Sequence, residues 1–200
     1  MNEHINVLLP KEWEGRSTEK WSRNVSVILA PAPGFCLMQY RDDQPADCNL
    51  QIFAGWFKGY YPQFDAAKVE RIDQAIQREM VCELGLGVEA AVFLPFVDSK
   101  IYKLEGRDNL VVVTRADITY EIVERLQLRE GKKMEVMPFD ENILDCGLYG
   151  NDRRMITHYF ENKVTIDAAA VPIEFGPLDK SLEGKVLVKQ NHHFSSRISL

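Results

Sequence analysis

A helical stripe in the middle of the chain constrains the fold more than any other feature. Apolar side chains recur at spacings of three and four through residues 66–84, and Gly85 and Gly87 follow where a helix C-cap is expected. The stripe consists of Val69, Ile72, Ile76, Met80 and Leu84. A helix with one apolar stripe has to bury it against another layer of structure. We therefore expect this helix to lie against the strands predicted on either side of it.

Strand patterns precede and follow the helix. Runs rich in β-branched and aromatic residues, bounded by Pro and Gly, predict strands at 24–30, 35–40, 50–57, 88–96, 109–114 and 134–139. The first two flank the turn 31–34 and indicate a hairpin, and residues 119–130 predict a second helix. The sequence therefore predicts an α+β domain.

The length of the chain favours one domain with extensions. Two hundred residues can bury one well-filled core. We expect a single domain over 1–200, with a lead-in segment at 1–22, a core at 23–145 and a C-terminal extension at 146–200. In that extension we expect further short strands, including one at 155–160 that holds His158.

Two carboxylates on the predicted helix carry the chemistry. Glu79 and Glu83 are four residues apart, about 40° around the helix axis, so they share one face. From the spacing alone, two solvated surface glutamates are the more common arrangement. The apolar stripe passes close by through Met80 and Leu84, however, and like charges beside a core are unfavourable unless a cation sits between them. Hard ions such as Mg²⁺ or Mn²⁺ suit these oxygen ligands.

The residues around this pair resemble the Nudix box. That pattern runs Gly, five residues, Glu, seven residues, Arg-Glu, apolar, any, Glu-Glu, any, Gly, apolar. The matching positions are Glu70, Arg78, Glu79, Met80, Glu83, Gly85 and Leu86. The resemblance implies a Nudix-type α/β/α sandwich with a mixed β-sheet.

The resemblance also assigns roles to individual residues. It implies that Glu79 and Glu83 are the main ligands of Mg²⁺ or Mn²⁺, and that Glu70 and Arg78 form an ion pair that fixes the preceding loop to the helix. A backbone carbonyl from the turn before the box can also contact the metal in this family, and Ala54 is our candidate.

The chain departs from the family pattern in two places. Cys82 stands where the first Glu of the Glu-Glu pair is expected, and a thiol is a poor ligand for Mg²⁺. The spacer between Gly55 and Glu70 is longer than in the family, and an insertion at 59–65 accounts for it. Its aromatic residues could stack on a nucleobase, or they could simply cover the edge of the core.

The function implied is metal-dependent hydrolysis of a nucleoside diphosphate linked to another group. The alternative is a Nudix-fold module that has lost catalysis and binds a ligand or partner, which Cys82 and the long spacer motivate. For the general base the acidic candidates are Glu105, Asp108 and Glu135.

Composition restricts the partners and the location. A net charge of −6, without a Lys/Arg cluster, argues against a nucleic-acid partner. No apolar run approaches the roughly 20 residues that span a bilayer, and no secretory signal is visible. The cysteines form no CxxC pair and indicate mostly buried free thiols. We expect a cytoplasmic protein with a small nucleotide-type substrate, for which a homodimer is one assembly consistent with the family.

Overall fold

A mixed β-sheet organises the chain in the computed structural model, which describes residues 21–42, 49–60, 63, 65–95, 103–104 and 107–190. The strands are β1 (Trp21–Ala30), β2 (Phe35–Tyr40), β3 (Leu50–Gln51), β4 (Phe53–Trp56), β5 (Leu86–Gly87), β6 (Ala91–Leu94), β7 (Lys103–Leu104), β8 (Arg107–Asp117), β9 (Lys133–Pro138), β10 (Val171–Ile173) and β11 (Val188–Lys189). The helices are η1 (Ala66–Lys68), α2 (Ile72–Leu84), α3 (Tyr120–Val123), η2 (Glu141–Asp145), α4 (Gly150–Ala168) and α5 (Lys180–Glu183).

The two longest strands, β1 and β8, run parallel at the centre of the main sheet. Their register extends from Trp21 opposite Asp108 to Ala30 opposite Asp117. The strand order is β10-β6-β8-β1-β2-β3, with β4 paired to β1, β7 to β8 and β9 to β2, and every pair in this sheet other than β1–β8 is antiparallel. The sheet is therefore mixed.

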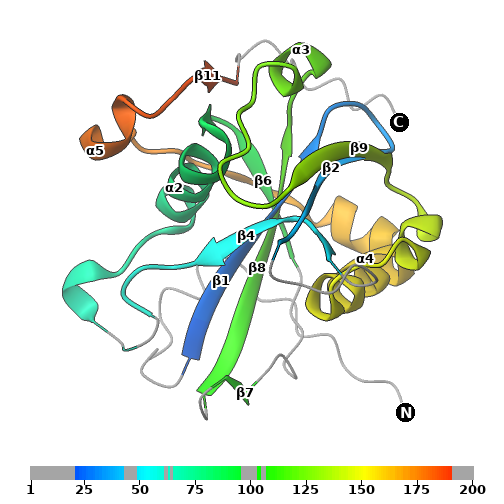
Figure 1. The fold of residues 1–200 in the computed structure, drawn as a ribbon. Helices are drawn as coiled ribbons and strands as arrows, with labels where there is room; N and C mark the ends of the chain where they lie inside the picture. The colour runs from blue at the N-terminus through cyan, green and yellow to red at the C-terminus, as the bar shows by residue number, and fades with distance from the viewer. Residues whose placement is uncertain are drawn as a thin grey trace.

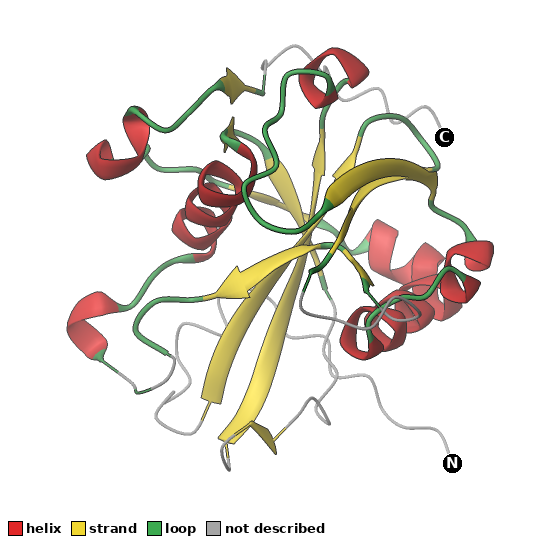
Figure 2. Ribbon diagram, viewed as in Figure 1, coloured by secondary structure: helices red, strands yellow, loops and turns green. Residues whose placement is uncertain are grey.

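Helices α2 and α4 lie on opposite faces of this sheet (Figure 1), and Figure 2 shows the same three layers by secondary structure. The strand β1 supplies apolar side chains to both faces of the sheet, because successive side chains along a strand point to opposite sides. Val25, Val27 and Leu29 join the core on the α2 side, whereas Ile28 joins the core on the α4 side. The fold is thus an α/β/α sandwich, as the resemblance to the Nudix box implied.

Helix α2 begins later than predicted, at Ile72 instead of residue 66. Residues 66–68 form the separate turn η1, and α2 begins at Ile72 after an extended Arg71 whose N–H bonds to Gln74 Oε1 at 2.9 Å. At the other end, Gly85 adopts a φ of 68°, the left-handed cap that glycine favours. The buried face carries Ala75, Ile76, Met80 and Leu84.

Two further predictions of secondary structure are wrong. Residues 155–160 lie within α4 instead of forming a strand, so His158 is a helical residue. The reason is that Met155, Ile156, Tyr159 and Ile166 share one helix face, which covers the second face of the sheet. In addition, residues 119–130 form only the short α3, capped by Thr119 Oγ1, before an irregular segment.

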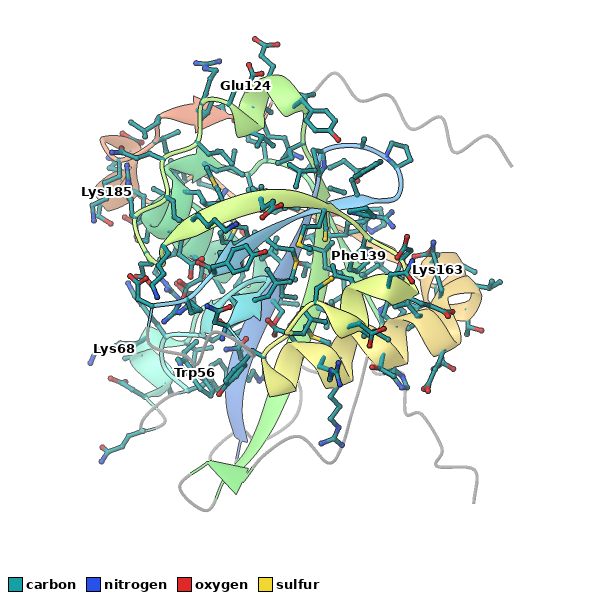
Figure 3. The ribbon with its side chains drawn as sticks, turned by 45° about the vertical axis from the view of Figure 1, so that its right-hand side comes forward. Trp56, Lys68, Glu124, Phe139, Lys163 and Lys185 are labelled. Atoms are coloured by element: carbon teal, nitrogen blue, oxygen red, sulfur yellow. The ribbon has the colours of Figure 1, made fainter. Side chains whose placement is uncertain are left out.

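Residues 146–190 contribute strands to both the main sheet and a second, two-stranded sheet. β10 extends the main sheet by pairing with β6, and β11 pairs with β5 directly after α2. Phe139, labelled in Figure 3, packs on Phe160 of α4 with ring centroids 5.1 Å apart. The C-terminal segment also holds the start of α2, since the N–H of Gly176 donates to Asp73 Oδ2 at 2.9 Å.

None of the helices in the described part of the chain combines the length and the hydropathy that crossing a bilayer requires. Cys36, Cys82 and Cys146 carry free thiols, and Cys48 lies outside the described residues. Of these three, only Cys36 is fully buried, so the expectation of mostly buried thiols was too broad.

A buried acid on α4 makes the stability of the fold depend on pH. Burial raises the pKa of Asp152 from 3.8 to about 7, although Ile52 N–H donates to it at 2.9 Å. Between these two values the native state holds a proton that the unfolded chain has released, so the free energy of unfolding falls as pH rises and levels off above about pH 7.

We expect Asp152→Asn to stabilise the protein at pH 8, on the order of 3 kcal/mol, because the amide needs no proton to be neutral. Urea unfolding from pH 4 to pH 9 measures this. The exposed Asp145→Asn is the control and should follow the wild-type profile. A wild-type stability that stays flat from pH 4 to pH 7 would contradict the assignment.

Candidate functional site

Glu83 is the most buried carboxylate of the α2 pair. It is 3% exposed, and its Oε2 atom has no hydrogen-bond partner among the described residues. The Glu79 side chain is 12% exposed and lies one turn earlier on the same helix. Both groups are therefore enclosed, which excludes a solvated surface pair.

The electrostatics of the pair favour a cation. Burial, together with the charges of Glu79 and Glu130, raises the pKa of Glu83 to about 8. Burial also raises the pKa of Glu79, against the lowering effect of Arg78. An enclosed, unbonded carboxylate oxygen needs either a proton or a positive ion, and a divalent cation meets that need.

Arg78 joins three parts of the site through its guanidinium group. It donates to both carboxylate oxygens of Glu70 at 2.8 Å, to the Trp56 carbonyl at 2.6 Å, and to Glu79 Oε1. Burial lowers the pKa of Arg78, but its bonds to Glu70 and the charges of both glutamates outweigh burial and keep it raised. The ion pair implied between Glu70 and Arg78 is present, and it links β4 and the following loop to α2.

The two ends of the long spacer meet. Lys58 N–H donates to Glu70 Oε2 at 2.9 Å, and Glu70 N–H donates to the Lys58 carbonyl at 3.2 Å. Gly59 has a φ of 82°, and a Cβ there would lie 2.6 Å from the backbone nitrogen of Val69. The extra residues therefore leave Glu70 beside Arg78.

The turn before the box meets the carboxylates at Gly55. A Cβ on Gly55 would lie 1.9 Å from Cδ and Oε1 of Glu79, so a side chain here would have to displace the Glu79 carboxylate. Ala54, the candidate carbonyl ligand, is the preceding residue of β4 and pairs with Ser26 of β1. Its role as a ligand stays a prediction.

Glu130 is a third carboxylate near the pair, and the sequence analysis missed it. Its negative charge raises the pKa of both Glu79 and Glu83. The neighbouring Arg129 fixes its backbone, because Arg129 N–H donates to the Glu83 carbonyl at 2.8 Å and its Nη1 donates to the Val81 carbonyl at 2.7 Å. No local pattern in the sequence marks this contact, since it joins residues more than 40 positions apart.

The three acidic residues predicted as candidates for the general base do not join the Glu79–Glu83 pair in the described part of the structure. Glu135 is on β9, where Lys133 Nζ bonds to it at 3.0 Å and holds its pKa below the usual value. Asp108 is at the start of β8, and in Figure 1 this start lies beside β7, away from α2. Glu105 lies outside the described residues.

The aromatic residues after Gly55 mostly serve the core. Phe57 and Tyr60 are buried and pack edge to face, and the Arg23 guanidinium lies 4.4 Å from the centre of the Tyr60 ring. Trp56, labelled in Figure 3, is partly exposed beside the same loop. Tyr61 and Phe64 lie outside the described residues.

The described residues contain no group of three or more His, Cys, Asp or Glu side chains arranged to hold a metal ion. The available donors are the carboxylates of Glu79 and Glu83, with backbone oxygens nearby. This all-oxygen set and the unbonded Oε2 of Glu83 fit Mg²⁺ or Mn²⁺. Cys82 is half-buried with a free thiol and adds no hard ligand.

Comparisons with known proteins identify the fold. No protein-family model matches the sequence, and no curated protein is significantly similar to it. The structure is similar to the E. coli ORF135 protein, with a TM-score of 0.51 and 18% identity over 73% of this chain and 93% of that one. It is also similar to a MutT protein from Methanosarcina mazei Go1 (TM-score 0.50, 13% identity, 74% and 99% covered).

A third structure carries the family in its name. The MutT Nudix hydrolase from Burkholderia pseudomallei matches with a TM-score of 0.50 and 21% identity over 70% of this chain and 98% of that one. The chain has the fold of the Nudix superfamily, as the box residues implied.

The close approach of Gly55 to Glu79 predicts the effect of one methyl group. We expect Gly55→Ala to push the Glu79 carboxylate aside and to destabilise the fold by about 1–3 kcal/mol, because the shift disrupts the contact of this carboxylate with the buried Arg78. Thermal unfolding measures the loss. Gly150→Ala, where a Cβ meets no atom within 4 Å, is the control. Equal stability of the two variants would contradict the packing described.

Proposed function

We propose that the protein is a metal-dependent hydrolase that cleaves a nucleoside diphosphate linked to another group. One observation carries the proposal: the buried Oε2 of Glu83 has no partner, on a helix whose residues match the Nudix box and within a Nudix fold. The Burkholderia pseudomallei protein of the same fold is a MutT Nudix hydrolase, which makes hydrolysis the first activity to test.

Glu79 and Glu83 would hold Mg²⁺ or Mn²⁺, with the carbonyl of Ala54 as a further donor. The ion would neutralise charge on the diphosphate and lower the pKa of an attacking water. Arg78 keeps the Glu79 carboxylate in place, and Glu70 keeps Arg78 in place. These contacts orient the ligands before the substrate arrives.

Glu130 is our candidate for the general base. Its side chain is 56% exposed, and its charge acts on both box carboxylates. In the proposed reaction the water oxygen bonds to phosphorus, the phosphoanhydride P–O bond breaks, and the leaving phosphate takes the electron pair. The proton released by the water passes to Glu130.

A second function, a ligand-binding module without catalysis, is favoured by the donor set. Cys82 removes one carboxylate, and Glu79 is already engaged by Arg78. Such a module would bind the divalent ion weakly and release no phosphate. Metal affinity and turnover together separate the two functions.

The first experiment measures phosphate release from a panel of nucleoside diphosphate derivatives, with Mg²⁺ or Mn²⁺ and a coupling phosphatase. We expect Glu83→Gln to reduce turnover at least a hundredfold while the fold stays intact, because the amide keeps the volume but removes the charge. Glu124→Gln, at the exposed site labelled in Figure 3, is the control. Full activity in Glu83→Gln would refute the metal assignment, and no turnover by the wild type would favour the module.

A second variant tests the alignment of the box. We expect Cys82→Glu to tighten Mg²⁺ binding about tenfold, because it restores a hard anionic ligand at the family position. Isothermal titration calorimetry measures the affinity, and Cys82→Gln controls for size. If the Glu and Gln variants bind Mg²⁺ alike, residue 82 does not face the ion.

A further inference from the structure

We propose that the amide oxygen of Gln39, on β2, is a further ligand of the divalent ion at Glu83. This assignment rests on the metal site of the proposed function and adds to it an oxygen from outside the box residues. Gln39 is 1% exposed, and its Oε1 atom has no hydrogen-bond partner among the described residues. A buried acceptor without a donor is costly, so the position of this oxygen points to a ligand.

Gln39 faces the side of the sheet on which α2 lies. Side chains alternate along β2: Leu37 belongs to the core on the α2 side, and Met38 belongs to the core on the α4 side. Gln39, two residues after Leu37, therefore points toward α2. Leu84, which follows Glu83 on α2, belongs to the same core as Leu37. The side chains of Gln39 and Glu83 are thus both buried in the layer between the sheet and α2.

One short loop segment contacts both residues. Arg129 N–H donates to the Glu83 carbonyl at 2.8 Å. A Cβ on Gly131 would lie 3.3 Å from Gln39 Oε1, so this glycine borders the amide. Two residues of chain span at most about 7 Å. The loop therefore holds the Gln39 amide close to the last turn of α2, which carries Glu83.

The chemistry of the two oxygens favours a cation between them. Gln39 Oε1 and Glu83 Oε2 are both buried acceptors without donors in the described part of the chain. An amide oxygen and an ionised carboxylate only accept hydrogen bonds, so neither can satisfy the other. A divalent ion satisfies both, because Mg²⁺ and Mn²⁺ bind carbonyl oxygens as well as carboxylates.

The box itself gives a reason for a ligand from another element. Cys82 leaves the helix one carboxylate short, and the Glu79 carboxylate already accepts from Arg78. An amide oxygen is a hard donor without a charge. It therefore adds to the oxygen set of the ion without adding a further repelling charge beside Glu83.

Calorimetry with Mn²⁺ alone tests the assignment on the whole chain, without substrate or turnover. We expect Gln39→Leu to weaken Mn²⁺ binding at least tenfold, because leucine nearly keeps the volume of the side chain but has no oxygen. Without metal, this variant should unfold at the wild-type temperature or above it, because it removes a buried oxygen that has no donor. Gln127→Leu, at an exposed position between α3 and β9, is the matched control and should bind Mn²⁺ as the wild type does.

A second variant should have the opposite effect. We expect Gln39→Glu to tighten Mn²⁺ binding at least fivefold, because it replaces a neutral oxygen ligand by an anionic one. This variant also decides the question if Gln39→Leu does not fold. Unchanged or weaker Mn²⁺ binding by Gln39→Glu overturns the inference, as does wild-type Mn²⁺ affinity in Gln39→Leu.

Glu83→Gln separates failure of this inference from failure of the proposed function. If Glu83→Gln loses Mn²⁺ binding and Gln39→Leu keeps it, the metal site stands and Gln39 is not one of its ligands. If the wild type does not bind Mn²⁺, or Glu83→Gln binds it as the wild type does, there is no metal site at these carboxylates. The inference then falls with the proposed function.

Discussion

The buried guanidinium of Arg78 is the interaction on which the rest of the site depends. It ties a strand end, a loop and a helix together through the Trp56 carbonyl, Glu70 and Glu79. A planar group with several donors in fixed directions can join three elements in this way, whereas an ammonium group could not do so with the same geometry. Because Lys58 and Glu70 bond to each other across the ends of the lengthened spacer, the insertion does not disturb this arrangement.

In contrast to Arg78, whose charge is compensated by two glutamates, the carboxylate of Glu83 has no compensating partner among the described residues. Glu83 is buried without a partner for Oε2, and Glu130 adds a further negative charge nearby. A fold that encloses such a group loses stability unless a cation or a proton compensates. This is the physical reason to regard the site as built for a ligand. In a purely structural ion-pair network, each buried oxygen would have a donor.

The two faces of the sheet have different roles. The α2 face carries the candidate site, and the α4 face has its own core, to which Ile28, Met38 and Tyr159 contribute. Residues 146–190 also reach the site face, since the C-terminal segment contacts α2 at Asp73 and again at Gly85. Residues 146–190 therefore pack on the same helix as the candidate site.

The resemblance to the Nudix box implied the Glu70–Arg78 pair. The sequence by itself determined α2 and the hairpin strands, because each depends on local spacings of apolar and turn residues. It also brought Glu79 and Glu83 to one helix face. The strand predicted at 155–160 was wrong, because a short apolar run fits a strand or a helix equally well until its packing surface is known. Only the tertiary structure brought Glu130 to the carboxylates and Gln39 to the same loop. Those contacts depend on how the 129–132 loop docks on α2 and β2, and no local spacing encodes the docking of segments that lie more than 40 residues apart.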